Sequence, residues 1–338
     1  MIEPRPINPL NIDIIEIPSC GINSIKKVLL KIINIISFDF YFTLYMKYYI
    51  KALFIFLLLI SCSGSKSEIN NSSITDSYIF NNELVWSDEF NEDGSVSTEK
   101  WNLETVAPNN GSWYNGEFQF YTDKSDNVIK KEGFLNITAK KENFNGKEYT
   151  SARLNTMDKF EFTYGKVEVR AKIPYGEGLW PAIWLLGANE LEVGWPMCGE
   201  MDILEHGDWI KDSTIDNQGL ISSAVHYHES FHLSQYENLP NSIFGPNPIG
   251  HFVRGETTLN NPYDDFHIFS IQWSPKKIEF FVDENKYHEF PVLTSNGPFN
   301  KPFFILLNLA VGGHFTDYYI DPSFTESTFE IDYVRVYQ

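Results

Sequence analysis

The chain is poor in cysteine and in basic residues. Its 338 residues include only three cysteines, Cys20, Cys62 and Cys198, which are too few for a disulfide framework. No CxxC or HExxH spacing occurs, so the sequence gives no support for a zinc site. Lysine and arginine number 26 against 45 acidic residues, a formal net charge of −19. Because nucleic-acid binding depends on basic contacts to phosphate, this composition argues against a nucleic-acid partner.

Helical spacing of apolar residues is also missing from residues 83–338, as are repeats and internal linkers. A period of two is present instead. KVEVRAKI (166–173) places apolar and charged residues on opposite faces, and 277–290 reads as the two strands of a hairpin. The long segment 239–265 is irregular and is expected to form a loop. Many short strands in one stretch predict an all-β sandwich or jelly roll.

The N-terminal region has a different texture. Residues 1–45 resemble no domain and are expected to be untranslated or unstructured. In the first case Met46 is the true start, and the predicted gene extends too far upstream. Residues 46–62 read as a signal peptide, because two lysines precede an apolar run that is too short to span a bilayer. The run ends in LISC, which resembles a bacterial lipobox and predicts a lipidated Cys62, followed by a flexible tether over 63–82. An ordinary cleaved signal or a buried apolar segment is the alternative.

Three acids stand close together in GEMDILEH (199–206). In a regular strand Glu200 and Asp202 share a face and Glu205 points the other way. The consecutive apolar pair Ile203–Leu204 breaks the alternation between them. A β-bulge at this pair would advance the register by one residue and return Glu205 to the face of the other two acids.

The bulged arrangement suits glycoside hydrolysis by retention. Four effective strand steps separate Glu200 and Glu205 by about 13 Å, and each side chain can lean inward by roughly 4 Å, which approaches the 5–5.5 Å carboxyl gap of retaining enzymes. Like charges this close share a proton, so one acid can begin protonated and another ionised. The alternative is a solvated acidic face on an edge strand.

The surroundings of the cluster carry several long motifs. They are LVWSDEF (84–90), GEFQFYT (116–122), YTSARLNT (149–156), YGKVEVRAKIPYGEGLWPAIWLLG (164–187), GWPMCGEMDILEHG (194–207), FHIFSIQWSP (266–275), NLAVGG (308–313) and IDYVRVYQ (331–338). In this order they resemble glycoside hydrolase family 16, and the bulged ExDxxE form resembles its laminarinase-like, endo-β-1,3-glucanase branch. The resemblance implies that 83–338 form a concanavalin A-like jelly-roll sandwich of two curved antiparallel sheets, with a concave cleft. It also implies that Glu200 is the nucleophile, Asp202 its helper and Glu205 the acid/base.

Sugar sites combine aromatic faces with groups that hydrogen-bond to hydroxyls. Trp113, Asn115 and Glu117 correspond to a G-W-G-N-N-E segment of the family, although SWYNGE departs from it. The other residues expected to bind substrate are Trp180, Trp184, Trp195, Arg153, His226 and Asn308. Core packing for Trp184 and a structural ion pair for Arg153 stay open as alternatives. His226 and His228 could hold a metal, but no third ligand is apparent in the sequence.

Many members of the family hold a structural Ca²⁺ through carbonyls near the first strand and an aspartate of the C-terminal strand. The matching positions here are Glu89, Gly133 and Asp332, and such oxygen ligands suit this ion. No cofactor is expected for catalysis. The expected partner is a polysaccharide of the β-glucan type. The protein is expected to be a monomer, held at a membrane only through its lipid anchor and located outside the cytoplasm, in the cell envelope or at the outer-membrane surface. Alternatives are a β-1,3-1,4-glucanase, an agarase-like β-galactanase, a transglycosylase with the same residues, or a non-catalytic carbohydrate-binding surface protein.

Overall fold

The computed structural model describes residues 82–338, apart from 109–110, 208–218, 232–249 and 294–296. The predicted untranslated segment, the signal peptide, Cys62 and the tether up to residue 81 lie outside these residues and stay predictions. Within the described part of the chain, no helix is both long and apolar enough to cross a membrane.

Two sheets form the domain, and their neighbouring strands are antiparallel except where β3 runs parallel to β6. The larger sheet has the order β15 (Asn285–Pro291), β14 (Lys277–Val282), β13 (His267–Trp273), β8 (Gly165–Lys172), β17 (Glu326–Tyr337), β5 (Phe134–Phe144), β6 (Lys147–Ser151) and β3 (Gln119–Tyr121), with β1 (Leu84–Asp88) on β17 and β4 (Val128–Lys131) on β5. The smaller sheet has the order β12 (Gly250–Thr258), β11 (Leu220–His228), β10 (Glu200–Glu205), β9 (Leu179–Gly187), β16 (Phe303–Val311), β7 (Arg153–Asn155) and β2 (Asn102–Leu103). The helical segments are short: α2 (Glu190–Val193) and the 3₁₀ turns η1 (Tyr114–Gly116), η2 (Glu229–Phe231), η4 (Pro298–Asn300) and η5 (His314–Thr316).

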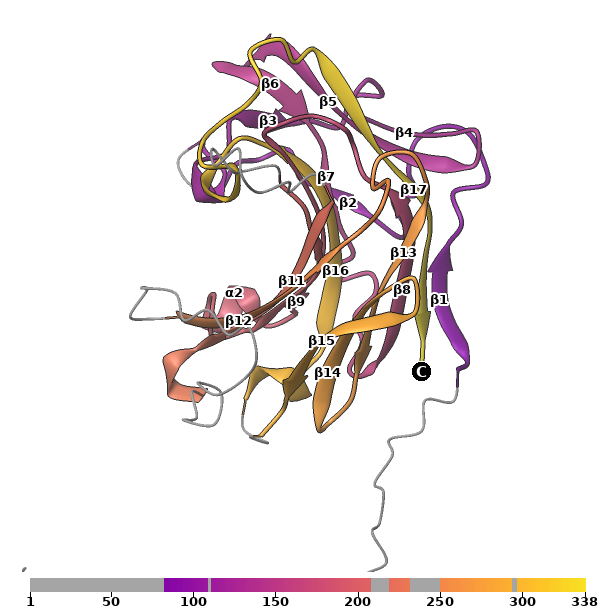
Figure 1. The fold of residues 1–338 in the computed structure, drawn as a ribbon, viewed down its shortest axis with the longest axis vertical. Helices are drawn as coiled ribbons and strands as arrows, with labels where there is room; N and C mark the ends of the chain where they lie inside the picture. Colours follow the sequence, from indigo (N-terminus) through magenta and orange to yellow (C-terminus); the bar gives the residue numbers. More distant parts are fainter. Residues whose placement is uncertain (1–81, 109–110, 208–218, 232–249, 294–296) are drawn as a thin grey trace, which may run out of the picture. The chain divides into compact units, whose positions relative to one another are not determined.

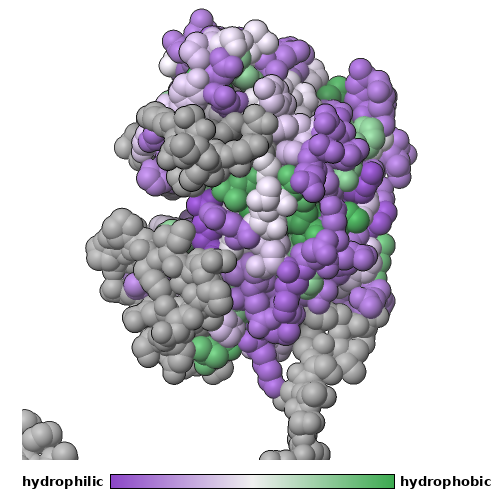
Figure 2. Space-filling view, viewed as in Figure 1, coloured by the Kyte–Doolittle hydropathy of each residue, from purple (hydrophilic) through white to green (hydrophobic). Residues whose placement is uncertain are grey.

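The smaller sheet curves around an open side of the domain, and the larger sheet covers its back (Figure 1). In the same orientation, the space-filling view shows a recess at the left edge (Figure 2). This is the predicted jelly-roll sandwich with a concave face.

The core lies between the two sheets and follows the alternation read from the sequence. In β8 every second residue is buried, beginning at Gly165 and including Val167, Val169 and Ala171. Because side chains alternate across a strand, the charged residues between them stay at the outer surface. The predicted hairpin is also confirmed, since β14 and β15 pair antiparallel across Asp283 and Glu284.

One prediction about the segment 239–265 is wrong. Residues Gly250–Thr258 form β12, which pairs with β11 along its whole length and ends the smaller sheet. Phe252, Arg254 and Glu256 are every second residue of this strand and share one of its faces. The strand was not predicted because the sequence before it is irregular. Residues 239–249 lie outside the described part of the chain.

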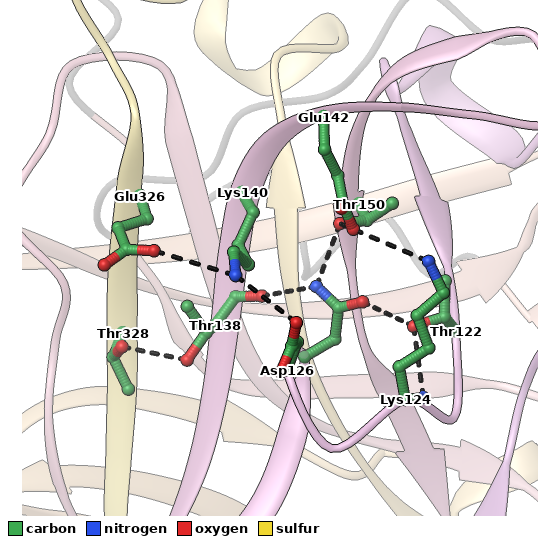
Figure 3. A network of polar contacts seen from close by, with 10 residues as sticks. Thr122, Lys124, Asp126, Thr138, Lys140, Glu142, Thr150, Glu326 and Thr328 are labelled. Atoms are coloured by element: carbon green, nitrogen blue, oxygen red, sulfur yellow. Dashed lines mark hydrogen bonds and ion pairs between the residues drawn. The ribbon is translucent and has the colours of Figure 1, made fainter.

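A buried polar network ties the strands at one end of the larger sheet (Figure 3). Asn127, fully buried just before β4, donates through Nδ2 to the Thr138 carbonyl and to Thr150 Oγ1, both at 3.0 Å. Its Oδ1 accepts from Thr122 Oγ1 at 2.5 Å. One amide therefore satisfies groups on β5, β6 and the segment after β3, and these strands cannot separate without leaving buried polar atoms unpaired.

Candidate active site

A β-bulge in β10 brings the three acids to one face. The pairing of β10 with both of its neighbours shifts just after Asp202, and Ile203 is the extra residue on the β9 side. Ile203 and Leu204 are both fully buried in the core between the sheets. Glu205 thereby returns to the concave face that carries Glu200 and Asp202. The predicted bulge is confirmed, and its cause is the consecutive apolar pair.

His226 lies beside the acids from the neighbouring strand, opposite Glu200 in the pairing of β10 with β11. Its Nε2 is 3.1 Å from Asp202 Oδ2 and 3.6 Å from Glu200 Oε1. One atom from each of these three residues lies within 4.8 Å of the others, a spacing that one cation could bridge. The structure groups His226 with two carboxylates and not with His228, which instead contacts Ser230. Metal binding by these residues stays untested.

Burial and mutual repulsion favour protons on the cluster. Desolvation, and after it the charge of Asp202, raises the pKa of Glu200 to about 8. Desolvation and the charge of Glu205 hold the pKa of Asp202 well above its usual range. Desolvation also raises the pKa of Glu205. Asp202 is only 4% exposed, so its ionised form would be poorly hydrated. Among the three acids, Asp202 is therefore the one on which a proton is most favourably held. A proton on Asp202 removes the negative charge that helps to raise the pKa of Glu200, so Glu200 can ionise while Asp202 holds the proton.

Trp180, on the concave face of β9, fixes the orientation of Glu205. Its Nε1 donates to Glu205 Oε1 at 3.1 Å, which leaves the other carboxyl oxygen for a transferable proton. One face of the indole stacks on Phe315, with ring centroids 4.8 Å apart and an interplanar angle of 15°. A Cβ at Gly207 would lie 2.6 Å from the Phe315 ring, so glycine leaves the room that this stack needs. Trp180 therefore orients the acid, and Phe315 covers part of the surface predicted to stack on sugar.

Comparison with known proteins agrees with this geometry. The profile of glycosyl hydrolases family 16 matches residues 115–335. The chain belongs to glycosyl hydrolases family 16.

Relatives and solved structures support the family assignment along most of the domain. A β-glucanase of Rhodothermus marinus is 36% identical over 268 residues, which cover 76% of this chain and 85% of that protein. A glucan endo-1,3-β-glucosidase of Cryptopygus antarcticus is 35% identical, with 75% of this chain and 90% of that protein covered. The crystal structure of a LamA variant of Zobellia galactanivorans in complex with laminaritriose and laminaritetraose is 40% identical, with a TM-score of 0.65, and covers 77% of this chain and 100% of that one.

In this family 16 domain, Trp184 lies beside the acids, opposite Asp202 in the pairing of β9 with β10, and belongs to a hydrogen-bonded chain. Its Nε1 donates to Asn308 Oδ1 at 2.8 Å, and Asn308 Nδ2 donates to the Tyr121 hydroxyl at 3.3 Å. The Arg153 guanidinium lies 4.7 Å from the Trp184 ring centroid and pairs through Nε with Glu104 Oε2 at 3.0 Å. Sequence reasoning missed Tyr121 and Glu104, which come from distant segments.

The SWYNGE segment places its residues at different depths. Trp113 is 2% exposed and Glu117 is 6% exposed, and Glu117 Oε2 accepts from Gln119 Nε2 at 2.6 Å and from the Tyr121 hydroxyl at 3.0 Å. Burial raises the pKa of Glu117. Asn115 is exposed and has a left-handed φ of 63°. Sugar contacts by these residues stay predictions, and for Trp113 and Glu117 they would require access from the cleft to a largely enclosed position.

Trp195 is the most accessible of the predicted aromatic residues, with 46% of its surface exposed. Its ring centroid is 6.0 Å from that of His226, beside the Glu200 end of the acidic cluster. A large exposed ring next to the reactive groups is suited to stack on a sugar. Its role in substrate binding stays a prediction.

His206 follows the acid/base directly and is buried. Burial lowers the pKa of His206 to about 4, so the imidazole is neutral at physiological pH. Its Nδ1 lies 2.8 Å from the Leu220 carbonyl and must donate to it, so Nε2 accepts from the Tyr263 hydroxyl at 3.2 Å. The two contacts tie the end of β10 to β11 and to the segment after β12.

Arg254 is a site residue that the sequence did not reveal, because it lies in the strand read as a loop. It lies on the same face as the acids, and its charge lowers the pKa values of Asp202 and Glu205 against the effect of burial. The alternation of Phe252, Arg254 and Glu256 was the signal that could have identified it.

Two of the three residues predicted to hold calcium, Glu89 and Asp332, have side chains that pair with arginines. Arg170 Nη1 donates to Asp332 Oδ2, and Arg335 donates to both carboxylate oxygens of Glu89 at 3.0 and 2.7 Å. The guanidinium of Arg170 already neutralises the Asp332 carboxylate, so this arrangement does not fit a cation at Asp332. Calcium binding there, with Gly133, stays a prediction that requires Arg170 to release Asp332.

Proposed function

We propose that the protein is a retaining endo-β-1,3-glucanase that cleaves laminarin-type glucan. The observation that carries this proposal is the bulge at Ile203, which gathers Glu200, Asp202 and Glu205 on the floor of a concave sheet. The named glucanase relatives and the laminarinase structures support the choice of β-1,3-glucan as substrate.

The reaction proceeds by double displacement. Glu200 attacks the anomeric carbon while Glu205 protonates the glycosidic oxygen, so that the aglycone leaves as an alcohol and a glycosyl ester forms on Glu200. Glu205, now ionised, then takes a proton from water, whose oxygen attacks the same carbon and releases Glu200. Asp202 holds a proton and so adds no negative charge beside Glu200 when Glu200 is ionised. The Trp180 indole holds the Glu205 carboxyl in one orientation through both steps.

Product analysis tests this proposal. Purified protein is incubated with laminarin, mixed-linkage β-glucan and agarose, with Glu200→Gln as the inactive control. We expect laminarin to give oligosaccharides of several lengths and, by NMR, products that first appear with the β anomeric configuration. Cleavage of another polymer with laminarin intact would transfer the assignment to the corresponding glucanase or galactanase. No cleavage of any polymer would favour the carbohydrate-binding alternative.

We also propose that the domain is displayed outside the cytoplasm through a lipid on Cys62. The support is the charged and apolar run of residues 46–62 that ends in LISC. Intact-mass measurement of the mature protein should show an acylated N-terminal cysteine at residue 62. Recovery of peptides from residues 1–45 would contradict the expected start at Met46.

A further inference from the structure

We infer that Arg254 is a positioning residue for the acid/base, which it holds through the aromatic pair Trp180 and Phe315 and through Ser222. This inference rests on the proposed function, because it assigns Arg254 a part in proton transfer by Glu205. None of the motifs that mark the family includes this residue.

The register of the smaller sheet explains how an edge strand reaches the acids. Asp202 of β10 pairs with Ala224 of β11, and Ala224 pairs with Arg254 of β12. The three residues therefore lie in one row across the concave face. Because Ala224 has only a methyl side chain, the long arginine side chain can extend across β11 toward the acidic cluster. Only 13% of the Arg254 side chain is exposed, so it lies along the sheet.

Two routes connect the guanidinium to Glu205. Arg254 Nη2 donates to Ser222 Oγ at 3.1 Å, and Ser222 Oγ donates to the Glu205 carbonyl at 3.4 Å. On the other route, the guanidinium lies 5.0 Å from the centroid of Phe315, which stacks on Trp180. Trp180 donates to the carboxyl of Glu205, so the contacts close into a ring of five residues. The ring fixes the Glu205 backbone on one side and its carboxyl on the other.

The chemistry of arginine suits both routes. A planar guanidinium can donate in its plane and lie over an aromatic ring with its face, whereas the ammonium of lysine cannot do both in a fixed geometry. Arg254 Nε also lies 3.3 Å from Glu256 Oε1, which restrains the plane of the group. Other charged or titratable groups that act on Glu205 and Asp202 are Glu200, His226 and the buried hydroxyl of Tyr287. Arg254 is the cation whose charge acts on both of these acids.

The test compares Arg254→Met and Arg254→Lys with the matched variant Arg335→Met on the far sheet. Arg335 also pairs with a carboxylate, that of Glu89, and lies 3.7 Å from the ring of Tyr333. Loss of either arginine should therefore lower the melting temperature by a similar amount. Only the Arg254 variants should have a lower kcat on laminarin, by about 10- to 100-fold, because a general acid misplaced by a fraction of an ångström transfers its proton less well. Their KM should change by less than about threefold.

Chemical rescue gives an independent readout. In Arg254→Ala, millimolar guanidinium chloride should restore part of kcat, because the free ion can occupy the site between Ser222 and Phe315. An equal concentration of sodium chloride should not, and guanidinium should leave the wild-type-like kcat of Arg335→Ala unchanged.

Unchanged kcat in Arg254→Met, or full activity in Arg254→Lys, would overturn the inference, as would loss of activity that follows loss of folding alone. If the wild-type protein cleaves no glucan, the proposed function is wrong. If the wild-type protein is active and the Arg254 variants have the same kcat, only the inference about Arg254 is wrong.

Discussion

Replacement of Trp180 by phenylalanine isolates a single hydrogen bond to the acid/base. The variant keeps an aromatic ring against Phe315 but removes the Nε1–H that donates to Glu205 Oε1 at 3.1 Å. A hydrogen bond to a charged group contributes about 1.5–3 kcal/mol. The indole N–H favours the ionised carboxylate, so its loss raises the pKa of Glu205. At 1.36 kcal/mol per pKa unit, the rise is about 1–2 units.

The assay is the pH dependence of kcat/KM on laminarin. Glu205 must be protonated when the glycosidic bond breaks, so a higher pKa moves the alkaline limb of the profile to higher pH by about 1–2 units. Because the three acids interact, the apparent pKa of the alkaline limb is a property of the whole cluster, and its displacement is interpreted for the cluster. We also expect kcat at the optimum to fall, because the carboxyl is less well oriented.

Trp184→Phe provides the control. It removes an equivalent indole N–H, which donates to Asn308 Oδ1 at 2.8 Å and not to Glu205. Its alkaline limb should stay within about 0.3 unit, or ~0.4 kcal/mol, of wild type. An unmoved limb in Trp180→Phe, or an equal displacement in both variants, would refute the assignment of Trp180 to the orientation of the acid.

Three further predictions concern stability and register. The pKa of Glu200 is raised to about 8 from 4.5, so the free energy of unfolding falls progressively as the pH rises from about 4.5 to 8. Glu200→Gln cannot ionise, and at pH 8 its free energy of unfolding should exceed that of wild type by at least ~1 kcal/mol, or about 2–4 °C in Tm. At pH 4.5 the difference should be much smaller. Tyr263→Phe leaves His206 Nε2 without this donor and should lower the free energy of unfolding by about 1–3 kcal/mol in urea titrations, whereas an unchanged midpoint would contradict the contact. Deletion of Ile203 removes the extra residue and leaves the spacing ExDxE, in which a regular strand keeps all three acids on one face, so the variant should keep kcat within about tenfold of wild type. Ile203→Val keeps the bulge and should also keep activity. Circular dichroism must show that the deletion variant folds, and a folded variant whose kcat falls by more than about 100-fold would contradict the assignment of Ile203 as the extra residue.

Much of this site follows from local sequence patterns. The alternation in 166–173 predicts β8, and the apolar pair Ile203–Leu204 predicts the bulge. Both signals are short-range, because side chains on one strand are ordered by the period of the strand alone. That is why the shared face of the three acids could be predicted before any neighbour of the strand was known.

Contacts between distant segments could not be predicted in the same way. Phe315 reaches Trp180 from η5, and Arg254 reaches the cluster from an edge strand two positions away. The parallel pairing of β3 with β6 has no signature in either strand. The depth of Glu117 depends on Tyr121 and Gln119 closing over it, which the motif alone does not encode.

The bulged strand also protects the accuracy of folding. In the native register, Met201, Ile203 and Leu204 enter the core and the acids lie on the opposite, concave face of the sheet. A slip of one residue against β9 or β11 would exchange these faces and press Glu200 and Asp202 into the hydrocarbon interior. Burial of unpaired carboxylates costs several kcal/mol each, so misregistered pairings are strongly disfavoured. The residues that make the strand reactive thus also make its wrong alignments unstable, and a neutralised variant should refold with more mispaired species than wild type.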